Sequence, residues 1–134
     1  MKNVFKVFLV LILVSFLLIS CEKNPGEGGN ATITGSVWVK DYNSTFTSLI
    51  SEYAGMKEDV FIVYGDNVGY DDKVETDYLG NYRFNYLRKG KYTIYVFSED
   101  STMTSPDGKV AVIKEVEITE NDQVLIVPQI LIYN

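Results

Sequence analysis

Short segments of alternating apolar and polar residues fill the chain from residue 31 onward, and turn-forming residues separate them. Within Ala31–Lys40, for example, Ile33, Gly35, Val37 and Val39 share one face of an extended chain, because successive side chains of a strand point to opposite sides. Short strands at such spacing are typical of two packed sheets. The pattern predicts seven strands: Ala31–Lys40, Val60–Tyr64, Val74–Thr76, Asn81–Leu87, Tyr92–Phe97, Val110–Ile118 and Val124–Tyr133.

One segment departs from the period of two. Four of its apolar residues recur at i, i+3, i+4 and i+7, which places them on one face of a helix: Phe46, Leu49, Ile50 and Tyr53. The spacing predicts a short amphipathic helix at Thr45–Ala54, between the first two strands. An irregular loop is the alternative.

The first 20 residues have the composition of an export signal. Lys2 and Lys6 precede an almost unbroken apolar run at Val7–Ile19. This run is shorter than the roughly 20 apolar residues that a membrane-spanning helix needs. We therefore predict a helical signal peptide at residues 1–20, with an uncleaved membrane anchor or a plain secretory signal as alternatives.

The only cysteine of the sequence follows this run directly. Leu18-Ile19-Ser20-Cys21 resembles the lipobox of bacterial lipoproteins, in which the cysteine thiol is alkylated with diacylglycerol, the peptide is cut before the cysteine, and the new amine is usually acylated. The resemblance implies that Cys21 is the lipid attachment site and the first mature residue. It further implies a lipid bilayer as partner and a place in the bacterial cell envelope, with the outer membrane, periplasmic or surface-exposed, as the expected site.

Residues 21–30 are rich in glycine and charge and predict a flexible tether. Removing residues 1–20 would take two lysines and no acidic residue, which leaves 10 basic against 18 acidic residues. An acidic domain of this kind lacks the clustered basic charge that nucleic-acid binding needs. The same charge predicts repulsion from anionic lipid headgroups.

The most distinctive signature runs from Thr76 to Val96, with the sequence TDYLGNYRFNYLRKGKYTIYV. It resembles the core shared by carboxypeptidase regulatory-like, CnaB-type and other transthyretin-like (prealbumin-like) domains. In this pattern Gly80 permits a tight turn, and Tyr82 and Phe84 point to one face of a strand. The resemblance covers roughly Thr32–Phe97 and implies a carboxypeptidase regulatory-like domain with a prealbumin-like (Ig-like) fold, although the predicted helical insertion is longer than is usual in these families. Together with the strand and helix patterns above, it predicts that residues 31–134 form an all-β, seven-stranded sandwich with one short helix.

The residue types limit the chemistry that the chain can perform. It contains no histidine, which excludes the usual Ser-His-Asp and Cys-His relays and the common zinc sites. We therefore expect a protein that is not an enzyme and has no cofactor or metal. A calcium site is the alternative, with oxygen ligands from turn residues. These residues do not have the spacing of a calcium-binding loop, and they are Asp66, Asn67, Asp71, Asp72 and Asp77.

Two further features are candidates for modification or binding. Asp100-Ser101-Thr102 resembles the short acceptor motif for O-glycosylation of exported proteins in Bacteroidetes-type bacteria, which implies Ser101 as the modified residue. Aromatic residues are also candidates for a strip that binds sugar or peptide, with cross-strand packing as the alternative. They are Trp38, Tyr42, Tyr64, Tyr70 and Tyr95.

These features predict a membrane-anchored cell-envelope lipoprotein whose β-sandwich is a non-catalytic binding or accessory module. Its expected partner, besides the bilayer, is an envelope protein or a glycan. The alternative is a structural subunit of an envelope complex, docked by an exposed sheet edge or by the predicted helix.

Overall fold

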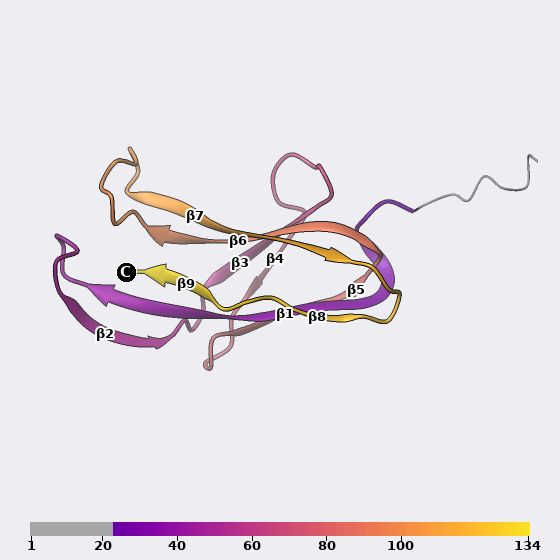
Figure 1. Ribbon diagram of the computed structural model, residues 1–134, viewed down its shortest axis with the longest axis horizontal. Coiled ribbons are helices and arrows are strands. Elements are labelled where there is room, and N and C mark those ends of the chain that lie inside the picture. Colours follow the sequence, from indigo (N-terminus) through magenta and orange to yellow (C-terminus); the bar gives the residue numbers. More distant parts are fainter. Residues whose placement is uncertain (1–22) are drawn as a thin grey trace, which may run out of the picture.

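The computed structural model describes residues 23–134, which form a sandwich of two β-sheets (Figure 1). In one sheet β1 pairs with β2, β5, β8 and β9, and the other sheet has the order β4-β3-β6-β7. The predicted all-β sandwich is confirmed. The described part contains nine strands: β1 (Glu27–Tyr42), β2 (Leu49–Ala54), β3 (Asp59–Tyr64), β4 (Asp72–Glu75), β5 (Asn81–Leu87), β6 (Gly90–Glu99), β7 (Lys109–Ile118), β8 (Val124–Ile126) and β9 (Ile130–Tyr133).

The helix predicted at Thr45–Ala54 is wrong. Residues 23–134 contain no helix, and so none that could cross a membrane. The second half of the segment is β2, which pairs antiparallel with β1. Leu49 is 46%, Ile50 66% and Tyr53 41% exposed, so their helix-like spacing does not correspond to a buried face.

The strand predicted at Val124–Tyr133 is interrupted and forms two strands, β8 and β9. Together with the additional strand β2, this corrects the predicted count of seven strands to nine in the described part. β8 and β9 are separated at Pro128, whose ring nitrogen has no hydrogen to donate to a sheet ladder. Just before it, the buried Val127 donates its N–H to the Thr34 carbonyl at 2.8 Å. Both strands run parallel to β1.

β1 is the longest strand of the described part, with 16 residues, and it is paired on both edges. The Val37 N–H donates to the Gly80 carbonyl at 2.8 Å, and the Gly55 N–H donates to the Val37 carbonyl at 3.0 Å. The Thr32 N–H donates instead to the carbonyl before β8, at 2.8 Å. The N–H and carbonyl of one residue point to the same edge of a strand, and those of the next residue point to the opposite edge. Val37 bonds to the segments beside β5 and β2, so these two strands lie along one edge of β1. Thr32, an odd number of residues away, bonds toward the other edge, where β8 and β9 lie.

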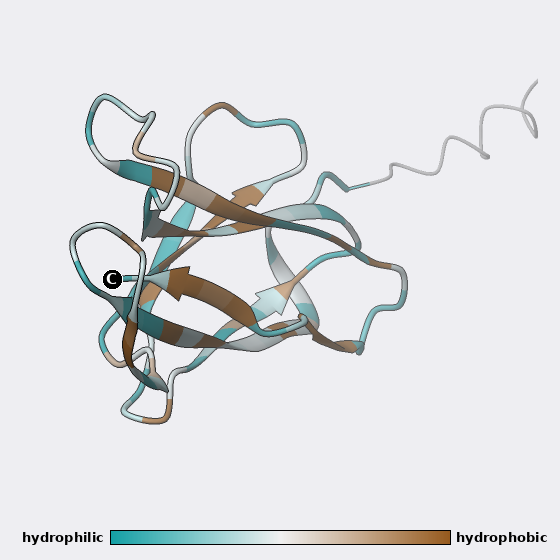
Figure 2. Cartoon of the chain, turned by 60° about the vertical axis from the view of Figure 1, so that its left-hand side comes forward, coloured by the Kyte–Doolittle hydropathy of each residue, from teal (hydrophilic) through white to brown (hydrophobic). Residues whose placement is uncertain are grey.

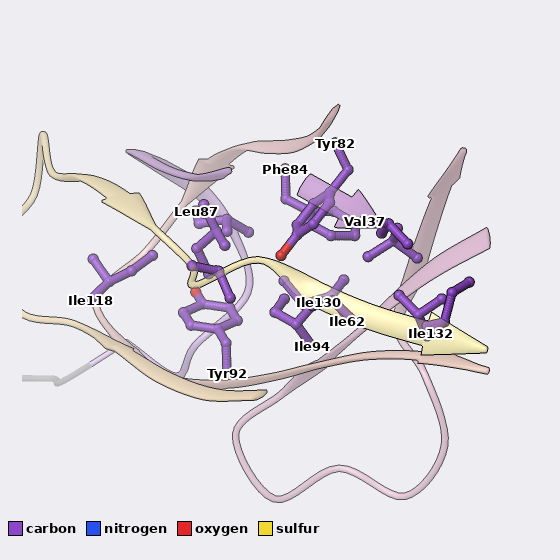
Figure 3. Close-up of a cluster of buried hydrophobic side chains, with 14 of the residues drawn as sticks. Val37, Ile62, Tyr82, Phe84, Leu87, Tyr92, Ile94, Ile118, Ile130 and Ile132 are labelled. Carbon is purple, nitrogen blue, oxygen red and sulfur yellow. The ribbon is translucent and has the colours of Figure 1, made fainter. Parts of the chain in front are cut away.

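The hydrophobic core lies between the two sheets (Figure 3). The inward face predicted for the first strand is confirmed, because Ile33, Val37 and Val39 are buried. Hydrophobic stretches lie along the strands, and most loops are hydrophilic (Figure 2). Both sheets contribute buried residues, among them Ile33, Tyr82, Phe84 and Ile130 from the first, and Val60, Ile62, Tyr92, Ile94 and Val96 from the second.

The chain joins the domain before residue 31. β1 begins at Glu27, and the Gly26 N–H donates to the Tyr92 hydroxyl at 2.9 Å. The ring of Pro25 occupies the space that a side chain at Gly90 would need. The part of the predicted tether from Pro25 onward is therefore packed against the domain.

The turn before β5 is held by the side chains of the signature. The Asp77 carboxylate accepts hydrogen bonds from the N–H groups of Asn81 at 2.9 Å and Leu79 at 2.8 Å, which hold the pKa of that carboxyl below its usual range. Gly80 has a φ of 79°, and a Cβ there would lie 2.5 Å from the Val37 carbonyl oxygen. The turn therefore requires glycine.

Candidate ligand-binding site

Four aromatic side chains pack together on the outer face of the β4-β3-β6-β7 sheet, and we call them the aromatic face. Phe61 of β3 stacks on Tyr95 of β6, with ring centroids 4.9 Å apart and planes inclined by 11°. Phe97 of β6 packs edge-to-face against both, at 5.6 Å. Tyr70, from the loop between β3 and β4, packs against Phe61 at 5.0 Å.

The alternation of the strands places these rings outside the core. In β6, Ile94 and Val96 are buried, so Tyr95 and Phe97 point to the opposite side of the sheet. The register places Phe61 directly opposite Tyr95. Aromatic pairs on neighbouring strands stabilise each other, so the stacked pair is also a fixed platform.

Tyr70 reaches this face from a loop that hydrogen bonds hold in place. The Asp71 carboxylate accepts a hydrogen bond from the Tyr64 N–H at 2.7 Å and one from the Asn67 side-chain amide at 2.9 Å. These bonds close the loop across the end of β3. They position the residue before Asp71, which is Tyr70, against Phe61.

The aromatic face is open to solvent. Tyr70 is 56% and Phe97 46% exposed. Ile113 of β7 lies opposite Tyr95 and is 55% exposed, which extends the apolar surface onto the next strand. Apolar side chains gathered on one face of a monomer commonly mark an interaction site.

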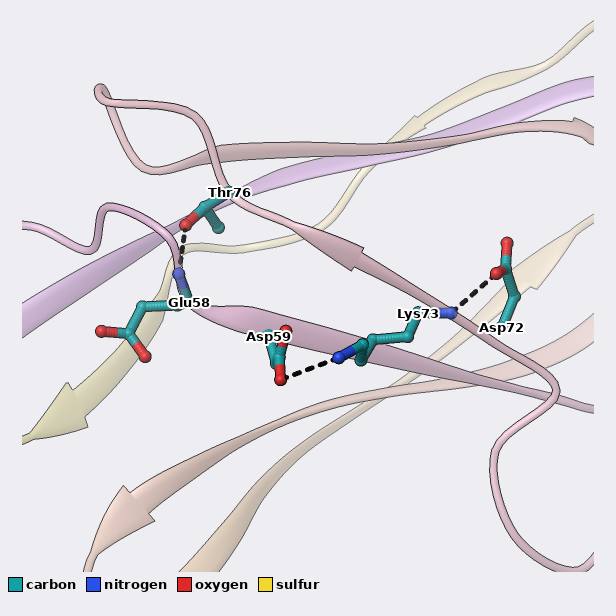
Figure 4. A network of polar contacts seen from close by, with 5 residues as sticks. All are labelled: Glu58, Asp59, Asp72, Lys73 and Thr76. Carbon is teal, nitrogen blue, oxygen red and sulfur yellow. Dashed lines mark hydrogen bonds and ion pairs between the residues drawn. The ribbon is translucent and has the colours of Figure 1, made fainter.

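Charged groups on β3 and β4 lie beside the aromatic face, and Figure 4 shows the pair formed by Lys73 and Asp59. Lys73 Nζ lies 3.0 Å from Asp59 Oδ2 and 6.0 Å from the centroid of the Phe61 ring. The hydrogen bond to Asp59 and its charge raise the pKa of Lys73. Burial, together with the neighbouring Tyr70, raises the pKa of Tyr95, so its hydroxyl stays protonated at neutral pH.

This arrangement offers a ligand both apolar surface and polar groups. The rings offer apolar surface, and the hydroxyls of Tyr70 and Tyr95 and the Lys73–Asp59 pair offer donors and acceptors beside it. The sequence has no histidine. Among residues 23–134, no three His, Cys, Asp or Glu side chains gather in the manner of metal ligands.

Only two of the five aromatic residues named from the sequence belong to this site, namely Tyr70 and Tyr95. Trp38 lies on β1, in the other sheet. Tyr64 packs against the core residue Tyr92 at 5.7 Å, and Tyr42 packs against Tyr133 at 5.7 Å. The predicted strip therefore does not form as a unit.

Phe61 and Phe97 belong to the site but were not named from the sequence. Phe61 stands in the uninterrupted apolar run of β3, VFIVY, where composition alone does not distinguish an inner from an outer position. Its immediate neighbours Val60 and Ile62 are buried, so the structure, and not the sequence, distinguishes the inward from the outward positions of β3.

The acidic turn residues considered as a calcium site do not converge. Asp71 bonds to its own loop, as described above, and the Asp72 carboxylate accepts a hydrogen bond from the Lys73 N–H at 2.8 Å. Asp77 lies in a different turn, before β5. The carboxylates of Asp71, Asp72 and Asp77 thus bond to nearby donors, and the described residues form no cation-ligand cluster there.

Ser101 is exposed in the loop between β6 and β7, at the end of the sandwich opposite the N-terminal segment (Figure 1). Asp100, only 5% exposed, organises this loop. Its carboxylate accepts hydrogen bonds from the Thr102 hydroxyl at 2.6 Å and from the N–H groups of Thr102, Thr104 and Ser105 at 2.7–2.8 Å. The Thr102 hydroxyl and these N–H groups hold the pKa of Asp100 well below its usual range. O-glycosylation of Ser101 stays a prediction.

Cys21 and the signal peptide predicted at residues 1–20 lie outside the described residues. Lipid attachment therefore also stays a prediction.

No protein-family model matches the sequence, and no curated protein matches it. Two solved structures align with 81% of this chain at 12% identity. One is a Pseudomonas aeruginosa protein proposed to bind carbohydrate, covered over 91% of its length with a TM-score of 0.45. The other is (S)-allantoin synthase, of which this chain spans 43%, with a TM-score of 0.42. Likeness at this level carries no argument about family or function.

Proposed function

We propose that this protein is a membrane-anchored envelope lipoprotein whose β-sandwich is a non-catalytic, glycan-binding module. The observation that carries the proposal is the aromatic face, a solvent-open group of four packed rings on one sheet. Neighbouring polar groups border it on the side of β4.

A glycan is the ligand whose chemistry fits this surface. One face of a sugar ring consists of C–H groups that pack on aromatic side chains, and its hydroxyls need hydrogen-bond partners around that contact. Tyr95, Lys73 and Asp59 offer such partners beside the rings. Because the rings are fixed on a sheet and have only two side-chain torsions each, little conformational entropy is lost on binding.

The anchor and the domain family are part of the same proposal. The lipobox-like Leu18-Ile19-Ser20-Cys21 supports acylation of Cys21. In the turn before β5, Asp77 accepts backbone hydrogen bonds and Gly80 occupies a position that has no room for a side chain. These are the structural roles expected of the signature in a prealbumin-like, carboxypeptidase regulatory-like domain, and they support that family.

A matched pair of tyrosine variants tests the ligand surface. Tyr70 is 56% exposed within the aromatic face, whereas Tyr78 is 76% exposed in a turn outside it. The full chain would be screened on a glycan array, and the affinity for a bound glycan measured by calorimetry. We expect Tyr70→Ala to weaken binding at least about tenfold, equivalent to about 1.4 kcal/mol, and Tyr78→Ala to leave it unchanged.

Two results would count against the ligand surface. One is a wild-type protein that binds no glycan on the array. The other is an equal loss of affinity in Tyr70→Ala and Tyr78→Ala, which would place the ligand elsewhere.

Intact-mass measurement of the membrane-extracted protein tests the anchor. We expect a chain that begins at Cys21 and carries acyl chains, and we expect Cys21→Ser to lose both the cleavage and the added mass. A Cys21→Ser chain cut at the same bond and still held by the membrane would refute lipid attachment.

A structural subunit of an envelope complex is the second candidate, and β2 is the observation that favours it. β2 is an edge strand that exposes Leu49, Ile50 and Tyr53, a surface that suits strand addition by another protein. A stoichiometric partner in a pull-down from detergent-solubilised envelope, lost in Ile50→Lys, would support this role over glycan binding.

A further inference from the structure

An open hollow of about 910 Å³ lies at the end of the sandwich where the described chain begins. Its lining comes from the segment that leads into β1, the turn between β5 and β6, and the connection between β7 and β8. Three lining residues are basic, Lys23, Arg88 and Lys89. Two are acidic, Glu117 and Asp122.

Arg88 lacks partners for its guanidinium among the described residues. The ion pairs of this part of the chain do not include it, and its Nε–H is buried without a hydrogen-bond acceptor. The guanidinium lies so close to Gly28 that a Cβ there would come within 2.7 Å of Nη2. A buried donor without an acceptor costs free energy, and a guanidinium binds oxyanions through two parallel hydrogen bonds.

The backbone around Arg88 is fixed, so the guanidinium does not depend on a mobile turn. The Arg88 N–H donates to the Gly26 carbonyl at 2.9 Å, and the Tyr92 hydroxyl donates to the Arg88 carbonyl at 2.7 Å. The same hydroxyl accepts from the Gly26 N–H. The chain leading to β1 and the turn at Arg88 are therefore joined into one rigid wall of the hollow.

The number of intervening residues limits how far this hollow can lie from the proposed anchor. Cys21 is two residues before Lys23, and an extended chain spans at most about 3.6 Å per residue, or about 7 Å for this segment. Pro25 and Gly26 are already packed on the domain. With acyl chains on Cys21, the hollow would lie at the level of the lipid headgroups.

We propose that the hollow binds the phosphate of an anionic bilayer lipid, with Arg88 as the main ligand and Lys23 and Lys89 beside it. This proposal rests on the lipid anchor of the proposed function. The headgroup phosphate supplies an acceptor for the guanidinium of Arg88, which lines the hollow and has no ion-pair partner among the described residues. Because acyl chains on Cys21 would hold the hollow at the headgroup level, the local concentration of a lipid phosphodiester such as that of phosphatidylglycerol would exceed that of free phosphate.

This site changes the expectation drawn from net charge. The net charge of the domain predicts repulsion from anionic headgroups. The hollow at the end that reaches them is lined by three basic and two acidic side chains, a local excess of one positive charge. Local charge outweighs net charge when the contact is shorter than the screening length of about 8 Å at physiological salt. The domain would then be held upright on the membrane rather than swing on a tether.

The two arginines of the sequence, Arg83 and Arg88, allow a direct test. Their Nε–H groups give two signals in a nitrogen-15 NMR spectrum, and Arg83 is the internal control. The full chain would be reconstituted into nanodiscs of phosphatidylcholine with and without phosphatidylglycerol. We expect the Arg88 signal to shift, and its exchange with water to slow, only in the discs that contain phosphatidylglycerol, while the Arg83 signal stays unchanged.

Two outcomes would overturn the proposal: an Arg88 signal that is the same in both discs, or one that inorganic phosphate shifts equally in pure phosphatidylcholine discs. Arg88→Gln should abolish the phosphatidylglycerol effect on neighbouring amide signals, and Arg83→Gln should preserve it. Retained amide signals of the core strands would show that the Arg88→Gln variant is folded.

The intact mass of the same preparation separates this proposal from the anchor. A chain without acyl groups would refute the anchor, and the hollow would then be tested with soluble dihexanoylphosphatidylglycerol. A saturable shift of the Arg88 signal would support the site, and no shift would overturn it.

Discussion

The two sheets share one core but present different outer faces to solvent. On the β1 sheet, short polar side chains bond across strands: the Thr34 hydroxyl donates to the Tyr82 carbonyl at 2.9 Å, and the Thr32 hydroxyl to the Asn85 side-chain oxygen at 3.2 Å. On the β4-β3-β6-β7 sheet, the corresponding positions carry the aromatic face. Trp38 also points outward on the first sheet, because its neighbours Val37 and Val39 are buried, but the packed aromatic pairs of residues 23–134 do not include it. The stacked pair of Phe61 and Tyr95 therefore distinguishes the outer face of the second sheet.

Neighbouring positions on β6 give the largest contrast. Ile94 is fully buried, and Tyr95 points outward. We expect Ile94→Ala to lower the free energy of unfolding by about 2–5 kcal/mol through the cavity it leaves. Tyr95→Ala should cost less than half as much while weakening glycan binding. Urea unfolding measures both, and equal losses would mean that the rings are structural.

The end of the same strand depends on hydrogen bonds to a carboxylate. Because the pKa of Asp100 is lowered in the folded state, its contribution to stability is present above the unfolded value of about 3.9 and is lost as the pH falls through the folded value. Asp100→Asn should therefore lower the urea midpoint at pH 7. The difference from wild type should shrink below about pH 4, and a constant difference at all pH values would argue against this role.

A smaller effect is expected on the polar outer face. Thr34→Val keeps the shape of the side chain but removes its hydrogen bond to the Tyr82 carbonyl. The expected loss is about 0.5–1.5 kcal/mol in the free energy of unfolding, with no change in glycan binding. A binding defect in this variant would show that the two faces are not independent.

The smallest effect on stability is expected at the border of the aromatic face. Lys73 is paired with Asp59 at the surface, where the two side chains are 42% and 43% exposed, and exposed pairs contribute little to folding. Lys73→Gln should leave the urea midpoint unchanged and reduce affinity for the glycan. A variant that unfolds more easily but binds normally would assign the pair to the fold.

Strand alternation was enough to predict most of the sandwich, because burial on one face forces the period of two. It failed where burial does not control the pattern. Leu49, Ile50 and Tyr53 are spaced like a helix face, yet they lie on an exposed edge strand where packing imposes no period. The parallel pairing of β8 and β9 with β1 joins residues about 90 positions apart, and no local signal encodes it.

The aromatic face was predictable only in part. Tyr70 and Tyr95 are aromatic residues in or next to predicted strands, but their meeting depends on the register between β3 and β6 and on the loop held by Asp71. No sequence pattern predicts the Arg88 hollow, because three separate segments of the chain form its walls. The lack of a hydrogen-bond acceptor for Arg88 Nε–H is visible only in the structure.

The pairing of β1 on both edges has a mechanical consequence. Tension that reaches the domain through its N-terminal segment pulls along the axis of β1, across the perpendicular hydrogen bonds to β5 and the slanted ones to β8 and β9. Those bonds are loaded in shear and must fail together, whereas a strand peeled from its end loses them one at a time. Force that enters through the N-terminal segment would therefore meet the combined resistance of the hydrogen bonds along both edges of β1.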